Sequence, residues 1–200
     1  FQFLKVNNKS WFARDINGFS DYKISFDSDN SYIDSWNGIF LSPLSDNVNE
    51  YIKNIIRKIL DNYSNLNGIH LDYLRYKDSM YGFNFDGCME FYNIYGVNPL
   101  SLNRGMISKR FGWSDKSILI AQEEWNTFKT DKISSLVYDI NQMIINYENN
   151  SELYDIALSV AVKPSVQESK NRWGQFWVDW LRRDILDFVV VMNYAKDIES

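Results

Sequence analysis

The stretch Asn67-Gly68-Ile69-His70-Leu71-Asp72-Tyr73-Leu74-Arg75-Tyr76 decides how the chain is interpreted. Apolar and polar side chains alternate along its first half, which predicts a β-strand over residues 68–73 with His70 and Asp72 on the same side. Asp72 therefore stands at the carboxyl end of this strand. A carboxylate loses much solvation when it leaves water, so one placed here indicates either a catalytic group or an ion-pair partner of Arg75.

The composition is that of a globular protein and excludes several classes. The chain has 200 residues, of which 45% are hydrophobic, and this suffices for a core within one domain over residues 1–200. The formal charge of -5 argues against a nucleic-acid partner, which requires a basic surface. No run of about 18 apolar residues is present, so no membrane span is expected. The aromatic fraction of 16% favours a carbohydrate ligand, because aromatic faces stack on sugar rings.

The chain has one cysteine, Cys88, and one histidine, His70. A single cysteine excludes an intrachain disulfide and a multi-cysteine zinc site, and a single histidine excludes a histidine-rich metal centre. A Cys–His thiol protease is disfavoured, because nothing around Cys88 in the sequence would lower the pKa of its thiol. We therefore expect neither a metal nor a cofactor.

The order of the predicted elements indicates the fold class. The predicted helices span residues 46–63, 87–95, 124–149 and 173–183. The predicted strands span residues 68–73, 154–162 and 185–194, and the last two are continuously apolar, as expected of strands covered on both faces. Strands alternating with helices predict a parallel sheet with helices outside it, either open or closed into a barrel. No glycine-rich phosphate loop follows any strand, which disfavours the nucleotide-binding open sheets.

Several segments, taken in order, resemble one family. They are residues 11–18, 40–43, 67–76, 124–128, 158–162, 174–180 and 186–194. In this order and spacing the chain is similar to the bacterial glycosyl-hydrolase-like barrels of the family-ten-type group, whose fold is the α/β TIM or (β/α)8 barrel. The resemblance makes the three strands the fourth, fifth and sixth of eight. A full barrel needs roughly 250 residues, so the resemblance implies a partial barrel that requires missing barrel segments or a pairing subunit.

In barrels of this class the site lies at the carboxyl ends of the strands. Residues 68–72 also resemble the Gly-x-Arg-x-Asp motif of amylase-type barrels, whose Asp is the nucleophile, although His70 replaces the Arg. The resemblance therefore implies that Asp72 is a catalytic carboxylate. The alternative is that Asp72 is a structural partner of Arg75 or of His70.

Glycoside hydrolysis needs a second carboxyl group, about 5 Å away for retention or about 6.5–9.5 Å away for inversion. Asp197, three residues after the last predicted strand, is the first candidate. Asp78 and Asp86, or a residue in barrel strands absent from the chain, are the alternatives. Glu123 and Glu124 are expected instead to favour the amino end of a helix.

The resemblance implies a glycoside hydrolase that acts on a polysaccharide or glycan through Asp/Glu acid–base or nucleophilic chemistry, without a metal or cofactor. The residues expected to contact the substrate are His70, Tyr73, Arg75, Lys163, Gln175, Asn193 and Tyr194. The first alternative is a non-catalytic carbohydrate-binding barrel, and the second is a metal-dependent hydrolase that uses Asp72 and His70. Relatives are often exported from bacterial cells, which implies a secreted or envelope location.

Overall fold

The computed structural model describes residue 4 and residues 7–23, 38–63, 65–107, 112–149 and 155–194. Contacts between residues group the chain into two compact units. The first unit comprises Phe1–Glu50 and Tyr76–Lys132, and the second comprises Tyr51–Arg75 and Ile133–Ser200. A single domain over residues 1–200 stays a prediction.

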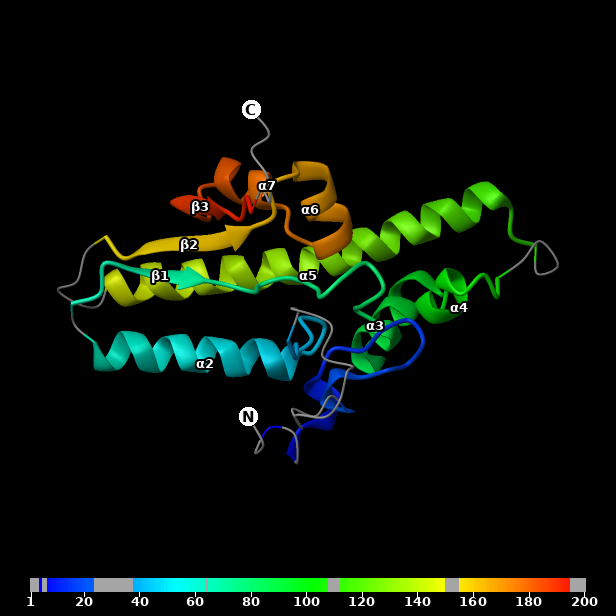
Figure 1. Cartoon of the computed structure of the whole chain (residues 1–200), viewed down its shortest axis with the longest axis horizontal. Helices are drawn as coiled ribbons and strands as arrows, with labels where there is room; N and C mark the ends of the chain where they lie inside the picture. Colours follow the sequence, from blue (N-terminus) through cyan, green and yellow to red (C-terminus); the bar gives the residue numbers. More distant parts are fainter. Residues whose placement is uncertain are drawn as a thin grey trace. The chain divides into compact units, whose positions relative to one another are not determined.

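The second unit contains a three-stranded parallel sheet in the order β1-β2-β3 (Figure 1). The strands are β1 (Gly68–Leu71), β2 (Ala157–Val162) and β3 (Phe188–Val191). Gly68 lets β1 approach β2, because a Cβ atom at this position would lie 2.7 Å from the carbonyl oxygen of Ala157. The structure thus confirms an α/β fold with a parallel sheet. The positions of these strands within a barrel stay a prediction.

The two faces of the sheet differ in burial. Paired residues of parallel strands point to the same face, so His70, Ser159 and Phe188 form one row across the sheet. Leu158 and Val160 of β2 lie on the opposite face and are fully buried. The face that carries His70 is open at its margins, since both His70 and Phe188 are exposed there.

The prediction of a buried strand over residues 185–194 is wrong in length and in burial. β3 has only four residues, and Phe188, Val190 and Val191 are 44–50% exposed. The physical reason is that no element among the described residues covers these apolar side chains. Asn193 and Tyr194 therefore follow the strand instead of forming part of it.

The second unit also contains residues 51–62 of helix α2 (Asp46–Asn62) and residues 133–149 of helix α5 (Asp115–Asn149), which lie side by side (Figure 1). The Tyr147 hydroxyl donates to the Leu60 carbonyl at 2.6 Å, and Lys53 Nζ pairs with Asp139 at 3.0 Å. The buried apolar stripe of α5 in this unit consists of Ile133, Leu136, Val137, Ile140 and Ile144. Each such side chain contributes about 1.5–3 kcal/mol through burial, so the stripe anchors the helix.

The helix predicted over residues 124–149 begins earlier, at Asp115. The Ser114 hydroxyl accepts a hydrogen bond from the Ser117 N–H at 3.1 Å and so caps the amino end. Leu119 is 60% exposed, so the first turns lack the inward apolar stripe on which the prediction depended. Residues 123–124 consequently lie inside α5, and their expected position at a helix start is wrong.

The helix predicted over residues 173–183 corresponds to α7 (Trp177–Arg182), which begins four residues later than predicted. A further short helix before it, α6 (Val166–Trp173), was not predicted. Ser165 caps the start of α6 with its side chain, and Gly174, at φ 72°, ends it in the left-handed conformation. Residues 166–172 are mostly polar and offer no apolar stripe, which is why the prediction missed α6 and placed the start of a helix at Trp173.

The first unit contains mostly short elements. These are the 3-10 helices η1 (Lys9–Trp11) and η2 (Asp21–Lys23) and the helices α3 (Phe85–Tyr95) and α4 (Pro99–Asn103). The fully buried Asp21 accepts hydrogen bonds from Lys77 Nζ at 3.3 Å and from the Phe40 N–H at 3.0 Å. Burial raises the pKa of Asp21, and the Phe40 hydrogen bond and the Lys77 charge oppose the rise. This network ties the irregular amino-terminal segment to the chain after β1.

A buried amine lies among aromatic rings in the same unit. Lys129 Nζ is 5.5–5.9 Å from the ring centroids of Tyr76, Phe83 and Trp125. Burial lowers the pKa of Lys129 to about 8. Burial also raises the pKa of the Cys88 thiol to about 12, which agrees with the argument against a thiol protease.

Candidate functional site

The candidate site is the edge of the sheet where the parallel strands end. β1 ends at Leu71 and β2 at Val162, so Asp72 and Lys163 follow their strands at the same edge. Asp72 is exposed, and its Oδ1 accepts the N–H of Tyr73 at 2.7 Å. Tyr73 has φ 57°, and its carbonyl accepts the Arg75 N–H at 2.8 Å. This tight turn leaves the Asp72 carboxylate open to solvent at the strand end.

His70 is joined to a residue that the sequence did not single out. Its Nδ1 lies 2.9 Å from Oγ of Ser159, the residue paired with it across β1 and β2. Ser159 is buried, whereas His70 is exposed. The signal in the sequence was a polar residue within the otherwise apolar segment of residues 157–162. The hydrogen bond fixes the imidazole in orientation and leaves Nε2 as the second ring nitrogen for a ligand.

Gln175 connects the loop after β1 to the loop after β2. Its fully buried carboxamide donates to the carbonyls of Leu74 at 3.2 Å and Ala161 at 2.9 Å. Its Oε1 accepts the Lys163 N–H at 3.1 Å and the Ser169 hydroxyl at 3.4 Å. Gln175 therefore ties both loops together through hydrogen bonds to their backbone. A direct contact between Gln175 and a ligand stays a prediction.

Three cationic side chains gather at this edge. Arg75 is buried, with its Cζ 5.1 Å from the ring centroid of Tyr73. Lys163 Nζ and Arg172 Cζ lie 5.1 Å and 4.9 Å from the ring centroid of Trp173. Burial lowers the pKa of Lys163, and the charges of Arg75 and Arg172 lower it further. Arg172 and Trp173 were not predicted as site residues, because their approach to Lys163 depends on α6 (Val166–Trp173), which follows the loop after β2 and was not predicted.

The remaining predicted site residues lie in different parts of the chain. Asn193 and Tyr194 follow β3 at the same edge, and Tyr194 is 82% exposed. Asp197 lies outside the described residues. Asp78 and Asp86 belong to the first unit. The identity of the second carboxyl group thus stays a prediction.

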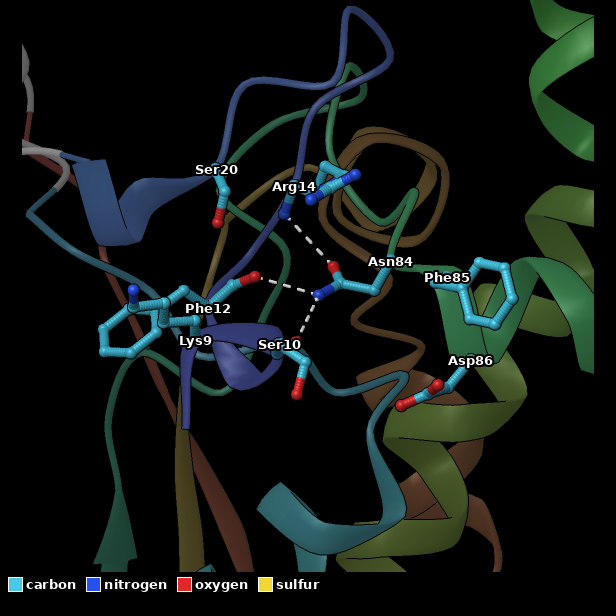
Figure 2. A pocket seen from close by; sticks show the side chains of 8 residues that line it. All are labelled: Lys9, Ser10, Phe12, Arg14, Ser20, Asn84, Phe85 and Asp86. Carbon is cyan, nitrogen blue, oxygen red and sulfur yellow. Dashed lines mark hydrogen bonds between the residues drawn. The ribbon is translucent and has the colours of Figure 1, made fainter. Parts of the chain in front are cut away.

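The described residues of the first unit line two hollows, and Asp86, an alternative for the second carboxyl group, lines the smaller one. The smaller has a volume of about 50 Å³, and Figure 2 shows Asn84 at its wall, bonded to backbone. Asn84 donates to the carbonyls of Ser10 at 3.0 Å and Phe12 at 2.8 Å and accepts the Arg14 N–H at 3.1 Å. This volume is well below the roughly 300 Å³ of small ligand sites. Asn84 therefore serves to bond the backbone of Ser10, Phe12 and Arg14.

The larger hollow is an open groove of about 370 Å³. Its lining includes Phe91, Tyr95, Trp113 and Glu124. The rings of Phe91 and Tyr95 stack at 4.4 Å, and burial followed by the Glu124 charge raises the pKa of Tyr95. The groove is aromatic, but the predicted catalytic carboxylate belongs to the other unit.

Two classes of site are not seen among the described residues. No group of three or more His, Cys, Asp or Glu side chains is placed to hold a metal ion there. Within the same residues, no helix combines the length and apolarity needed to cross a membrane.

The parallel sheet, flanking helices and strand-end carboxylate define an α/β protein whose sheet is consistent with part of a TIM-type barrel. A family model described as "Glycosyl hydrolase-like 10" matches residues 25–200, and the chain belongs to this family. This confirms the resemblance inferred from the sequence motifs. The search of curated proteins gave no match.

One solved structure similar to the chain is the PgaB (BpsB) glycoside hydrolase domain from Bordetella bronchiseptica. The TM-score is 0.56 at 16% sequence identity, and the match covers 76% of this chain. It covers only 39% of the chain in that structure, so the present chain spans well under half of it. At this identity the likeness shows the fold alone. The family supports a glycoside hydrolase-like function.

Proposed function

We propose that the chain carries part of the active site of a glycoside hydrolase that cleaves a polysaccharide or glycan, with Asp72 as a catalytic carboxylate. The observation that carries the proposal is the position of Asp72, which is exposed one residue beyond β1 at the edge where the parallel strands end. Family membership and the shared fold support the class of reaction. In TIM-type barrels this edge forms the site.

Asp72 acts on the anomeric carbon or on a water molecule beside it, and a second carboxyl group protonates the leaving oxygen. We assign that second role to Asp197. His70, held by Ser159, donates or accepts a hydrogen bond with a sugar hydroxyl through Nε2. Tyr73, which is 53% exposed, Asn193 and Tyr194 supply further contacts with the glycan.

The test is hydrolysis of a glycan panel by the full-length protein and by its Asp72→Asn variant. The variant should fold normally and lose activity by about 10²–10⁴-fold, because the amide can neither take up a proton nor attack as a carboxylate. The matched control is Asp179→Asn, which changes a carboxylate paired with Arg183 at 3.3 Å. Unchanged turnover by Asp72→Asn removes Asp72 from the mechanism. Glycan binding without turnover on any substrate favours the non-catalytic carbohydrate-binding barrel.

A further inference from the structure

The loops after β1 and β2 bring positive charges together. Gln175 holds the carbonyl of Leu74 and the amide of Lys163 on one carboxamide, at 3.2 Å and 3.1 Å. Arg75, the residue after Leu74, and Lys163 therefore lie in neighbouring loops at the same edge of the sheet. The backbone on which these side chains stand is thus held by Gln175, and the charge of Arg75 acts on Lys163.

Arg172 is the third cation, and the ring of Trp173 brings it close to Lys163. Lys163 Nζ and Arg172 Cζ lie within 5.1 Å of the centroid of the same half-buried ring. An aromatic face attracts cations and holds two such groups close together without neutralising either of them. We call Arg75, Lys163 and Arg172 the cation cluster.

Within the cation cluster, positive charges act on one another. Glu168, whose Oε1 is 3.1 Å from Arg172 Nη1, is the acidic group that opposes the shift in the pKa of Lys163. Burial, Arg75 and Arg172 all act in the other direction and lower that pKa. Like charges held together repel one another, and the chain as a whole carries a charge of -5. The repulsion that Arg75 and Arg172 exert on Lys163 is therefore a local feature with an energetic cost.

We propose that the cation cluster is a subsite for a carboxylate-bearing sugar residue, such as a uronic acid, in an acidic glycan. The guanidinium of Arg172 matches a carboxylate in a two-point hydrogen-bonded geometry, and the ammonium of Lys163 acts as a point charge beside it. An incoming carboxylate relieves the repulsion within the cluster. The proposal rests on the proposed function, which places the glycan at this edge of the sheet.

The experiment measures binding and not turnover. The full-length protein with Asp72→Asn is titrated by calorimetry with oligosaccharides of polygalacturonate, alginate and hyaluronan, each beside its carboxyl-reduced form. At least one acidic oligosaccharide should bind about tenfold or more tightly than its reduced form, since a charge-assisted hydrogen bond contributes about this much. Lys163→Gln and Arg172→Gln should each remove most of that preference.

The matched control is Lys170→Gln. Lys170 is also on α6 and also lies over an aromatic ring, 4.3 Å from the centroid of Phe176, but it is outside the cation cluster. It should leave the preference unchanged. Equal binding of acidic and reduced forms, no binding of any acidic form, or an equal loss in Lys170→Gln overturns the proposal.

The two proposals fail in different ways. If the wild-type protein hydrolyses no glycan but still prefers the acidic forms, the subsite stands and the hydrolase fails. If the wild-type protein hydrolyses a neutral glycan and shows no preference for carboxylates, the hydrolase stands and the subsite fails.

Discussion

Replacing Gln175 with methionine removes the hydrogen bonds beneath the candidate site while keeping the length of the side chain. The carboxamide is fully buried and makes four hydrogen bonds, with Leu74, Ala161, Lys163 and Ser169. Methionine fills a similar volume with a flexible apolar chain, so the change leaves little cavity. What it removes is the link between the loop after β1 and the loop after β2.

The magnitude follows from the four bonds. A hydrogen bond contributes about 0.5–1.5 kcal/mol net, and a buried polar group left without a partner costs about 1–3 kcal/mol. The longest bond, 3.4 Å to Ser169, contributes least. The apolar contacts of methionine offset part of the loss. We expect Gln175→Met to lower the free energy of unfolding by about 3 kcal/mol.

Urea unfolding of the full-length protein, followed by circular dichroism, measures this change from the midpoint at constant slope. Gln167→Met is the matched control, because Gln167 is exposed on α6 and should change stability by less than about 0.5 kcal/mol. A loss below about 1 kcal/mol in Gln175→Met would refute the assignment of Gln175 as the support of both loops.

Two further predictions concern the first unit. Because burial lowers the pKa of Lys129 to about 8 from 10.5, the folded protein binds this proton more weakly than the unfolded chain. The contribution of Lys129 to stability should therefore rise by up to about 3 kcal/mol between pH 8 and pH 10.5. The raised pKa of Cys88 acts in the opposite direction, so the measurement is the difference in urea midpoint between the wild type and Lys129→Met. This difference should shift in favour of the wild type across the range, and parallel profiles would contradict the assignment. Gly87→Ala should cost about 1–3 kcal/mol despite the helix propensity of alanine, because its Cβ would lie 2.8 Å from Cβ of Leu44. An unchanged melting temperature would show that Leu44 moves aside freely.

Local patterns in the sequence were sufficient to locate β1 and β2, although not their exact ends. Alternation around His70 predicted a strand over residues 68–73 with Asp72 at its carboxyl end, whereas β1 ends at Leu71, and the continuously apolar segment predicted β2. The alternation of strands with helices then predicted that the strands run parallel. These inferences succeed because each depends on residues close together in the sequence.

The supports of the site could not be predicted in the same way. The pairing of His70 with Ser159 depends on the register of β1 against β2, which no local pattern states. The role of Gln175 depends on backbone groups that are up to 101 residues away in the sequence. Helix α6 was missed because Val166 is the only apolar side chain among residues 166–172, and the predicted helix began at Trp173.

The proposed catalytic carboxylate and most of the cation cluster come from different loops. Asp72 lies in the loop after β1, whereas Lys163, Arg172 and Trp173 belong to the segment between β2 and α7. Bond cleavage and selection among glycans can therefore diverge separately in descendants of this protein. A designer who wishes to change the preferred glycan should graft the second segment together with Gln175 and leave the first intact.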